Sequence, residues 1–295
     1  MRVALTGASG FIATALAEAM VARGWEVVGL TRSGGVKARG VQVVVADYTR
    51  PGPWQTVVGG CDAVVNLAGA SIMRRWSSRY KQLIASSRIE TTARVAEALG
   101  PGKRLVSASA VGYYGSRGDE RLTEEAPPGD DFLSRVCLQW ERAAVDAADR
   151  GGSVAVVRLG VVLGRGGGAL GRMLGAFRAG LGMVLGDGRQ WMSWVHMRDV
   201  VEAVMWLVEN PRFTGPFNLV APNPVTNAEF TRVLAQALGT RPRGRMPAWV
   251  LRLVMGEGAE VMLASTRAVP ARLLAAGYRF RFPEIDEALA EVVGR

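Results

Sequence analysis

Cysteine and histidine are scarce in this sequence. Its 295 residues include two cysteines, Cys61 and Cys137, and a single histidine, His196. Two cysteines provide no disulfide framework, and one histidine cannot build a multi-histidine metal site. We therefore expect no metal site, and the cysteine content fits best with the reducing environment of the cytoplasm.

Long apolar runs are also missing. No run of about 18 apolar residues, the length that a membrane-spanning helix needs, occurs anywhere in the chain. Glu18 and a glycine-rich turn interrupt the apolar N-terminal region before any plausible signal-peptide cleavage site. We therefore expect a cytoplasmic protein that is not exported and has no membrane partner.

Lysine is nearly absent, and yet the chain is basic. There are 36 Lys+Arg against 26 Asp+Glu, a formal net charge of +10. Lys37, Lys81 and Lys103 are the only lysines, and the many arginines are dispersed along the chain. A nucleic-acid surface gathers its basic residues on one element, so we interpret this charge as a compositional bias and expect no nucleic-acid partner.

What is present is an ordinary globular composition with an alternating pattern. Apolar residues make up 49% of the chain and charged residues 21%, which is typical of a folded protein. Short β-branched runs alternate with longer amphipathic stretches, the pattern of βαβ units. We predict an α/β fold with a doubly wound, Rossmann-type parallel sheet. The expected strands are 2–6, 26–30, 41–45, 63–67, 104–107 and 154–159, and the expected helices are 11–23, 77–99 and 132–150.

The pattern changes after Leu163, where a glycine-rich loop begins. We assign residues 1–163 to a dinucleotide-binding domain, completed by return segments near 191–220. Residues 164–295 are predicted to form a smaller, mostly helical C-terminal substrate lobe, in which prolines divide a helical cap at 241–295. Within the lobe we expect helices at 170–181, 197–209 and 226–238, and strands at 191–195 and 216–220.

A glycine pattern directly follows the first expected strand and opens the first expected helix. Gly7 permits a tight turn, and Gly10 leaves room for a diphosphate at the helix N-terminus. Main-chain N–H groups there bind anionic oxygens. Strand, loop and helix together predict dinucleotide binding, and the expected contacts in this loop are Gly7, Ser9, Gly10, Phe11 and Ile12.

The end of the second expected strand favours NADP(H) over NAD(H). An acidic residue at that place would bind a ribose 2′-hydroxyl and repel a 2′-phosphate, but the sequence reads Thr31-Arg32-Ser33. Arg32 offers a guanidinium fork for the phosphate, and Thr31 and Ser33 supply hydroxyls beside it. The alternative is that Arg32 merely lies in solvent on a loop.

Two further turns lie where a dinucleotide would pass. Asp47 follows the third strand and could accept a hydrogen bond from the adenine amino group. Leu67, Ala68 and Gly69 follow the fourth strand, where small residues leave room for adenosine. Both turns come at carboxyl ends of strands, where open α/β sheets bind their ligands.

These motifs give the sequence a resemblance to the extended short-chain dehydrogenase/reductase superfamily, in its NAD(P)-dependent epimerase/dehydratase family. Thr6-Gly7-Ala8-Ser9-Gly10-Phe11-Ile12, Asn66-Leu67-Ala68-Gly69 and Ser107 to Gly115 carry the resemblance. The chain looks most like an atypical subfamily marked by Arg75-Trp76, by Ser87 to Thr92 and by a C-terminal domain of unknown function over about residues 245–292. The resemblance implies a cofactor contact for Arg88, the alternative being a solvated helix residue.

The usual proton relay of that superfamily is absent. A Ser after the fifth strand survives as Ser109, but the Tyr-x-x-x-Lys pair does not, because no lysine follows Lys103. By position, Cys137 and Glu141 fill the two places. Positioned acid/base catalysis contributes about 10²- to 10⁴-fold, so another donor is needed. We predict Ser109 and Tyr113 as catalytic residues, with Tyr114 as a neighbouring candidate and Cys137 as a disfavoured nucleophile.

Several residues keep two interpretations. Trp191, Trp194 and His196 either line the substrate side or pack the lobe against the sheet. Arg158, within a buried strand, contacts either an anionic group or a structural partner. Loop arginines such as Arg165 and Arg189 are either solvated or hold an anionic substrate.

Three functions remain open from the sequence. The leading hypothesis is an NADP(H)-dependent oxidoreductase that acts on a small carbonyl or alcohol. The alternatives are a nucleotide-sugar epimerase or dehydratase, and a catalytically silent NADP(H) sensor. The expected partner is a small-molecule substrate, and homodimer formation is left open.

Overall fold

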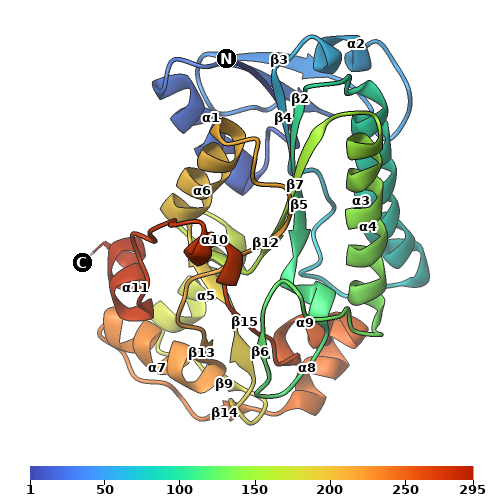
Figure 1. The fold of residues 1–295 in the computed structure, drawn as a ribbon. Helices are drawn as coiled ribbons and strands as arrows, with labels where there is room; N and C mark the ends of the chain where they lie inside the picture. Colours follow the sequence, from blue (N-terminus) through green and yellow to red (C-terminus); the bar gives the residue numbers. More distant parts are fainter. Residues whose placement is uncertain (295) are drawn as a thin grey trace.

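A seven-stranded parallel sheet forms the centre of the computed structural model, which describes residues 1–294. The strand order is β12-β7-β5-β4-β1-β2-β3, so the direction of winding reverses between β1 and β4 (Figure 1). This reversal confirms the predicted doubly wound, Rossmann-type sheet. Its strands are β1 (Arg2–Thr6), β2 (Glu26–Thr31), β3 (Val41–Val45), β4 (Ala63–Asn66), β5 (Arg104–Ala110), β7 (Ser153–Leu159) and β12 (Gly215–Leu219).

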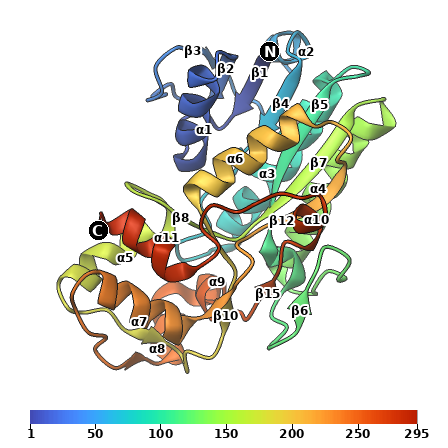
Figure 2. The same cartoon turned by 60° about the vertical axis from the view of Figure 1, so that its left-hand side comes forward.

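Helices cover both faces of the sheet (Figures 1 and 2). One face carries α1 (Phe11–Ala22) and α6 (Met197–Glu209), which pack against each other. The other face carries α3 (Ser78–Ala98) and α4 (Phe132–Asp149), with the short α2 (Trp54–Gly59) beside α3. The three-layer arrangement explains why the strands read as nearly continuous apolar runs.

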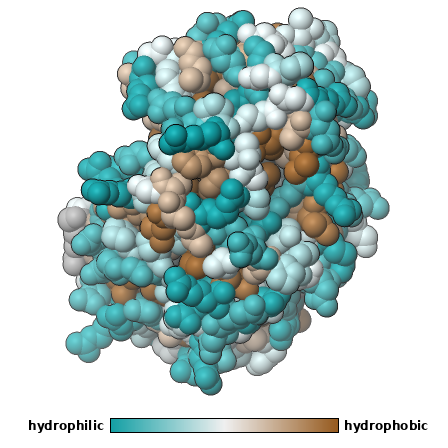
Figure 3. Space-filling view, in the orientation of Figure 1, coloured by the Kyte–Doolittle hydropathy of each residue, from teal (hydrophilic) through white to brown (hydrophobic). Residues whose placement is uncertain are grey.

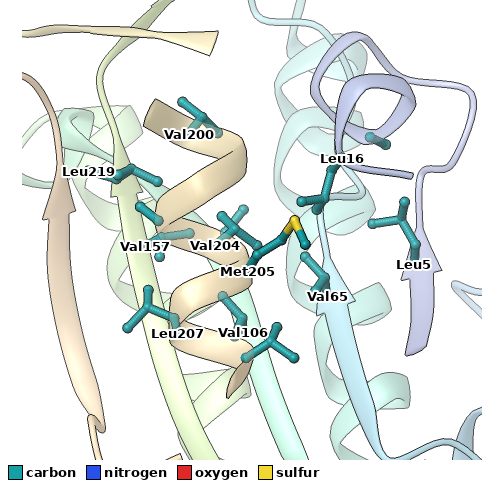
Figure 4. Packing of buried hydrophobic residues seen from close by; sticks show 14 of the residues in the cluster. Leu5, Leu16, Val65, Val106, Val157, Val200, Val204, Met205, Leu207 and Leu219 are labelled. Carbon is teal, nitrogen blue, oxygen red and sulfur yellow. The ribbon is translucent and has the colours of Figure 1, made fainter. Parts of the chain in front are cut away.

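Alternation along the strands divides the core into two halves. Val3 and Leu5 of β1 join the cluster beneath α1 and α6, whereas Ala4 joins the cluster beneath the helices of the other face. This follows from the two-residue period of a strand. Figure 4 shows the first cluster, in which Val200, Val204 and Leu207 of α6 lie over the sheet.

The rest of the chain forms a lobe below the carboxyl ends of the strands (Figure 2). Short strand pairs connect its segments: β8 with β11, β9 with β14, β10 with β13 and β6 with β15. The strands are β6 (Arg121–Leu122), β8 (Val161–Leu163), β9 (Val184–Leu185), β10 (Trp191–Met192), β11 (Trp194–His196), β13 (Val225–Thr226), β14 (Arg245–Met246) and β15 (Arg267–Ala268). The helices are α5 (Gly168–Arg178), α7 (Asn227–Ala237), α8 (Ala248–Met255), α9 (Glu260–Leu263), α10 (Ala271–Ala275) and α11 (Ile285–Val293), and 3₁₀ turns cover Val111–Tyr114 and Gly256–Ala259.

One predicted strand is divided in two. The sequence predicts a single strand over 191–195, but the structure separates β10 from β11 at Ser193. The Ser193 hydroxyl accepts a hydrogen bond from the main-chain N–H of Ala268 and donates to the carbonyl of Thr266. Contacts with a segment more than 70 residues away therefore end β10, which no local pattern reveals.

The surface of the protein is more hydrophilic than its buried core. Figure 3 shows a face that is mainly hydrophilic, with scattered apolar patches. Among residues 1–294, no helix is both long and apolar enough to cross a membrane.

Asp199 ties α6 to the C-terminal segment. Its carboxylate is fully buried and accepts hydrogen bonds from the main-chain N–H groups of Arg281, at 2.6 Å, and Phe282, at 3.1 Å. Burial raises the pKa of Asp199, and these two hydrogen bonds oppose the rise. The side chain therefore satisfies two donors that the fold buries far from any strand partner.

We predict that Asp199→Ala destabilises the protein by about 2–5 kcal/mol, because it leaves two buried N–H groups without acceptors at about 1–3 kcal/mol each. Urea unfolding followed by circular dichroism measures the change. Asp146→Ala, at an exposed position of α4, is the matched control and should be near neutral. A loss in Asp199→Ala no larger than in the control would contradict the proposed anchor.

Candidate functional site

The glycine turn after β1 lies at the point where the sheet reverses its winding. Gly7 has φ +66°, a backbone conformation that L side chains rarely adopt, and a Cβ there would come within 3.2 Å of the Leu67 carbonyl. Gly10 is the N-cap of α1, and no side chain caps the helix. The first N–H groups of a 12-residue helix are thus left open to an anionic ligand.

Buried hydrogen bonds fix the neighbouring turn after β4. The side-chain amide of Asn66 donates to the hydroxyls of Thr92, at 2.7 Å, and Ser107, at 3.2 Å. Its carbonyl oxygen accepts from the Thr6 hydroxyl at 2.6 Å, and that hydroxyl accepts from the N–H of Leu67. The carboxyl ends of β1, β4 and β5 are therefore held in one rigid arrangement.

These two turns and the end of β2 surround a cavity of about 180 Å³. The structure brings together seven of the residues expected to bind the cofactor: Gly7, Ser9, Gly10, Thr31, Arg32, Leu67 and Gly69. Within residues 1–294 the cavity is lined by one charged side chain, Arg32, and by no carboxylate. An anion with polar oxygens suits this lining.

Four lining residues were not predicted from the sequence: Tyr48, Thr49, Ser87 and Thr91. Tyr48 and Thr49 directly follow Asp47, so the turn after the third strand was recognised from the sequence, but these two residues in it were not. Ser87 and Thr91 stand four residues apart on α3, a spacing that places both on one helix face. That spacing was a usable signal.

Arg32 and Tyr48 form the far end of the cavity. The Tyr48 hydroxyl lies beside the Arg32 guanidinium and the N–H of Gly7, and the tyrosine is almost completely buried. Burial raises the pKa of Tyr48, while the charge of Arg32 opposes the rise. The phenol is therefore a neutral hydrogen-bonding group next to an exposed cation.

Asp47 does not line the cavity. Its Oδ1 accepts from the hydroxyl of Thr49 at 2.6 Å and from the N–H of the same residue at 3.2 Å. These bonds lower the pKa of Asp47 and hold its carboxylate in a local turn. The adenine contact expected for this side chain remains a prediction.

Three more predicted residues lie beside the cavity but do not line it. The Phe11 ring packs against Gly164, Gly167 and Gly168, where any Cβ would clash with the ring. Ile12 packs against the core, and Ala68 is buried behind Gly7. The glycine-rich loop predicted after Leu163 is thus a packing surface for Phe11, the first residue of α1.

Arg88 is a largely buried cation at the edge of the cavity. Its guanidinium donates to the carbonyls of Ala70, at 2.9 Å, and Ile84, at 3.0 Å, and a Cβ on Gly69 would lie 3.0 Å from its Cζ. Burial lowers the pKa of Arg88. Its burial and its two hydrogen bonds argue against the solvated-residue interpretation. Within residues 1–294 it forms no ion pair, so its charge lacks a carboxylate partner.

Ser109 lies in a buried polar network under β5 and β7. Its hydroxyl donates to Glu141 Oε1 at 2.6 Å. Arg158 binds the same carboxylate with two donors, Nε to Oε1 and Nη2 to Oε2, both at 2.8 Å. Burial disfavours the Arg158 charge, but Glu141 more than offsets this and raises the pKa of Arg158. Arg158 thus has a structural carboxylate partner.

The two neighbouring tyrosines have different environments. Tyr114 is fully buried, and its hydroxyl donates to Asn218 at 2.7 Å and accepts from Arg158 at 2.9 Å. Burial raises the pKa of Tyr114 to about 12. Tyr113 stacks on Arg158, whose Cζ lies 3.5 Å from the ring centroid, and its hydroxyl makes no hydrogen bond within the described chain. Only the Tyr113 phenol is therefore available to a ligand.

The cysteines are both buried thiols. Burial raises the pKa of Cys137 to about 12, and burial also raises the pKa of Cys61. Thiolates are the reactive form, so neither residue is suited to nucleophilic attack. Over residues 1–294, no group of three or more His, Cys, Asp and Glu residues could hold a metal ion.

The aromatic residues of the lobe have mainly structural partners. Trp194 is fully buried, and its indole N–H donates to the carbonyl of Asn223. His196 Nδ1 accepts from the N–H of Arg198, so Nε2 carries the proton and faces Glu291 at 3.2 Å. Burial lowers the pKa of His196 despite that carboxylate, which favours the neutral ring.

The remaining open residues also have partners or lie in loops. The indole of Trp191 donates to Asp119 at 2.7 Å. The guanidinium of Arg165 binds the carbonyl of Glu291, and the N–H of Arg189 closes a turn on Asp187. The Trp191 contact favours the packing interpretation for that residue, and the substrate contact expected as one alternative for Arg165 and Arg189 stays a prediction.

Comparison with known proteins identifies the relationships of the chain. A model of the NAD dependent epimerase/dehydratase family matches residues 3–220, and a model of a domain of unknown function, DUF1731, matches residues 246–292. The bovine (Bos taurus) epimerase family protein SDR39U1 is 41% identical over 303 residues, covering 99% of this chain and all of the bovine protein.

Solved structures agree with these relationships. The crystal structure of human epimerase family protein SDR39U1 with NADPH has a TM-score of 0.87 and 37% identity, and the alignment covers 99% of each chain. The nucleoside-diphosphate sugar epimerase from Corynebacterium glutamicum has a TM-score of 0.79 and 34% identity. That alignment covers all of this chain and 58% of the longer protein.

The resemblance inferred from the glycine turn and the β5 motif is therefore confirmed across almost the whole length. The chain belongs to the NAD-dependent epimerase/dehydratase family and carries the C-terminal DUF1731 domain.

Proposed function

We propose that this chain binds NADP(H) and catalyses the oxidation or reduction of a small alcohol or carbonyl compound, as an atypical extended short-chain oxidoreductase. The observation that carries the proposal is the cavity at the end of β2, where Arg32 and seven hydroxyl-bearing residues meet without any lining carboxylate in the described chain. The human relative that was crystallised with NADPH supports the choice of cofactor.

The residues present fit a phosphorylated dinucleotide. The bare N-terminus of α1 provides N–H groups for the diphosphate, because Gly7 and Gly10 remove the side chains that would fill that space. Arg32, Thr31 and Ser33 would hold the 2′-phosphate at the other end. Arg88, a buried cation without a carboxylate partner in the described chain, would face the cofactor from the Gly69 side.

Bound NADP(H) would supply or take up a hydride. The protein must then supply or accept the accompanying proton. Its hydrogen bonds indicate which side chains donate and which accept. Arg158 donates two hydrogen bonds to the Glu141 side chain, and Glu141 Oε1 also accepts the hydrogen bond that the Ser109 hydroxyl donates. The Ser109 oxygen then has only lone pairs to offer, so it would orient a substrate hydroxyl by accepting from it.

Tyr113 is the group we propose for proton transfer. Its hydroxyl has no partner within residues 1–294, and its ring is stacked on the Arg158 guanidinium, which holds the phenol in place. Arg158 therefore connects both proposed catalytic residues, Ser109 through Glu141 and Tyr113 through its ring. We place substrate binding between residues 1–163 and the lobe of residues 164–295.

An epimerase or dehydratase of nucleotide-linked sugars is the second candidate. The C. glutamicum protein that bears such a name is 34% identical to this chain. Oxidation followed by reduction at the same cofactor would consume no NADPH overall. Net NADPH turnover with a small carbonyl panel therefore favours the oxidoreductase, whereas product formation from a nucleotide sugar without net turnover favours the second candidate.

Two buried free thiols fit a cytoplasmic protein, which we propose as its location. The partner that we propose is a small-molecule substrate, and the oligomeric state is open.

Arg32→Ala should weaken NADPH binding by about tenfold or more and leave NADH binding nearly unchanged, because a charged hydrogen bond contributes roughly 1.5–3 kcal/mol. Isothermal titration with both cofactors measures this. Arg39→Ala removes an exposed arginine outside the cavity and should change neither affinity. Equal losses for NADPH and NADH in Arg32→Ala would refute the phosphate role.

Ser109→Ala and Tyr113→Phe should each lower kcat by about 10²- to 10⁴-fold, the usual contribution of positioned acid/base groups, without loss of NADPH binding. Turnover is followed by NADPH absorbance with the compound that the wild-type chain converts fastest. Tyr278→Phe, whose hydroxyl donates to the Asp199 carbonyl, is the control. Full activity of Ser109→Ala would refute the catalytic role of Ser109. Tight NADPH binding by a wild-type chain that converts none of the compounds would favour the sensor.

Native Cys137 should resist alkylation. At about pH 8.5 an exposed thiol is half ionised, whereas a thiol with a pKa of about 12 is ionised about 10³-fold less. Iodoacetamide labelling followed by mass spectrometry should therefore modify Cys137 only after unfolding in urea. Rapid labelling of Cys137 in the folded protein would restore the covalent mechanism that its burial disfavours.

A further inference from the structure

The short helix α8 presents an exposed apolar surface to solvent. Leu253, Trp249 and Val254 are exposed to 68%, 67% and 65%, the largest exposed fractions of any large hydrophobic residue within residues 1–294. At 100° per residue these three side chains span an arc of about 140°, and Leu251 on the opposite side is the only buried residue of the helix. The apolar arc therefore points away from the protein core.

Four arginines lie in or just before α8. Residues 241–256 contain Arg241, Arg243, Arg245 and Arg252 and no acidic residue. The first three are exposed and form no ion pair within residues 1–294. Figure 1 shows β14, which contains Arg245, at the same lower end of the molecule as α8. We name Arg241, Arg243, Arg245, Trp249, Leu253 and Val254 the α8 surface.

The next acidic residues along the sequence, Glu257 and Glu260, do not neutralise Arg241, Arg243 and Arg245. Glu257 binds Lys81 at 2.5 Å, and Glu260 binds Arg252 at 2.9 Å. Both carboxylates therefore already have basic partners. Pairing two copies of the chain through the α8 surface would bring like charges together, which opposes a homodimer at this place.

We propose that the α8 surface docks the protein on an anionic phospholipid surface. Exposed Trp and Leu side chains beside arginines are the combination that lies in the interface of an anionic bilayer, with the apolar arc among the acyl chains and the cations at the headgroups. A protruding helix needs no complementary groove for this contact. The expectation of no membrane partner rested on the lack of a spanning segment, and a surface contact needs none.

Co-sedimentation of the full chain with vesicles tests the proposal. We expect binding to vesicles of phosphatidylcholine with phosphatidylglycerol, at least tenfold weaker binding to phosphatidylcholine alone, and weaker binding at high salt. The double variant Trp249→Ser/Leu253→Ser and the triple variant Arg241→Gln/Arg243→Gln/Arg245→Gln should each lose at least tenfold in affinity for the anionic vesicles.

Matched controls replace exposed residues of the same kinds elsewhere on the protein. Leu83→Ser/Val145→Ser and Arg39→Gln/Arg142→Gln/Arg150→Gln should bind the anionic vesicles like the wild-type chain. NADPH titration and thermal melting should be unchanged in the α8 variants, which separates this proposal from the proposed function. Absence of wild-type binding, equal binding to both vesicle types, or binding that survives both α8 variants would overturn the proposal. A dimer in analytical ultracentrifugation that Trp249→Ser/Leu253→Ser abolishes would also overturn it, in favour of contact between copies.

Discussion

The constraint on which the site depends is the bare main chain between β1 and α1. Gly7 adopts a positive φ close to the Leu67 carbonyl, and Gly10 opens α1 without a side-chain cap. Asn66 then locks the adjoining turn through hydrogen bonds to β1, β5 and α3. The protein thereby keeps a helix N-terminus uncovered at the edge where three parallel strands end, and the cavity, its hydroxyls and Arg32 are arranged around it.

Much of the fold was predictable, because it follows from patterns local to the sequence. Most of the main strands are short β-branched runs that are buried on both faces, and the spacing of these runs predicted them almost to the residue. The glycine turn could be predicted for the same reason, because its conformation and its open N–H groups belong to consecutive residues. The separation of β10 from β11 was not readable, because it depends on Ser193 bonding to a distant segment.

Residues of the site could be predicted only where their place along the sequence, and no tertiary contact, decides their position. Arg32 follows from its place after β2, whereas the role of Tyr48 depends on how its ring folds back toward Gly7. Whether the Ser109 hydroxyl donates or accepts depends on Glu141 from α4 and Arg158 from β7. This hydrogen-bond network is built from three separate elements. A sequence motif names such residues one by one and does not reveal which of them donates a proton to which.

The buried charges have a common consequence. Arg158 is paired with Glu141, which accepts the hydrogen bond of Ser109, whereas Arg88 binds the carbonyl of Ala70 and has no carboxylate partner within the described residues. A buried cation without a partner lowers the stability of the fold unless a bound anion pairs with it. Together with Arg32 it gives this cavity a positive character.

A crystal structure of the chain grown with NADPH tests the central claim most directly. The account predicts the diphosphate against the main-chain N–H groups at the start of α1 and the 2′-phosphate on the Arg32 guanidinium. A cofactor bound elsewhere, or a cavity that stays filled by the protein's own side chains at saturating NADPH, would contradict it.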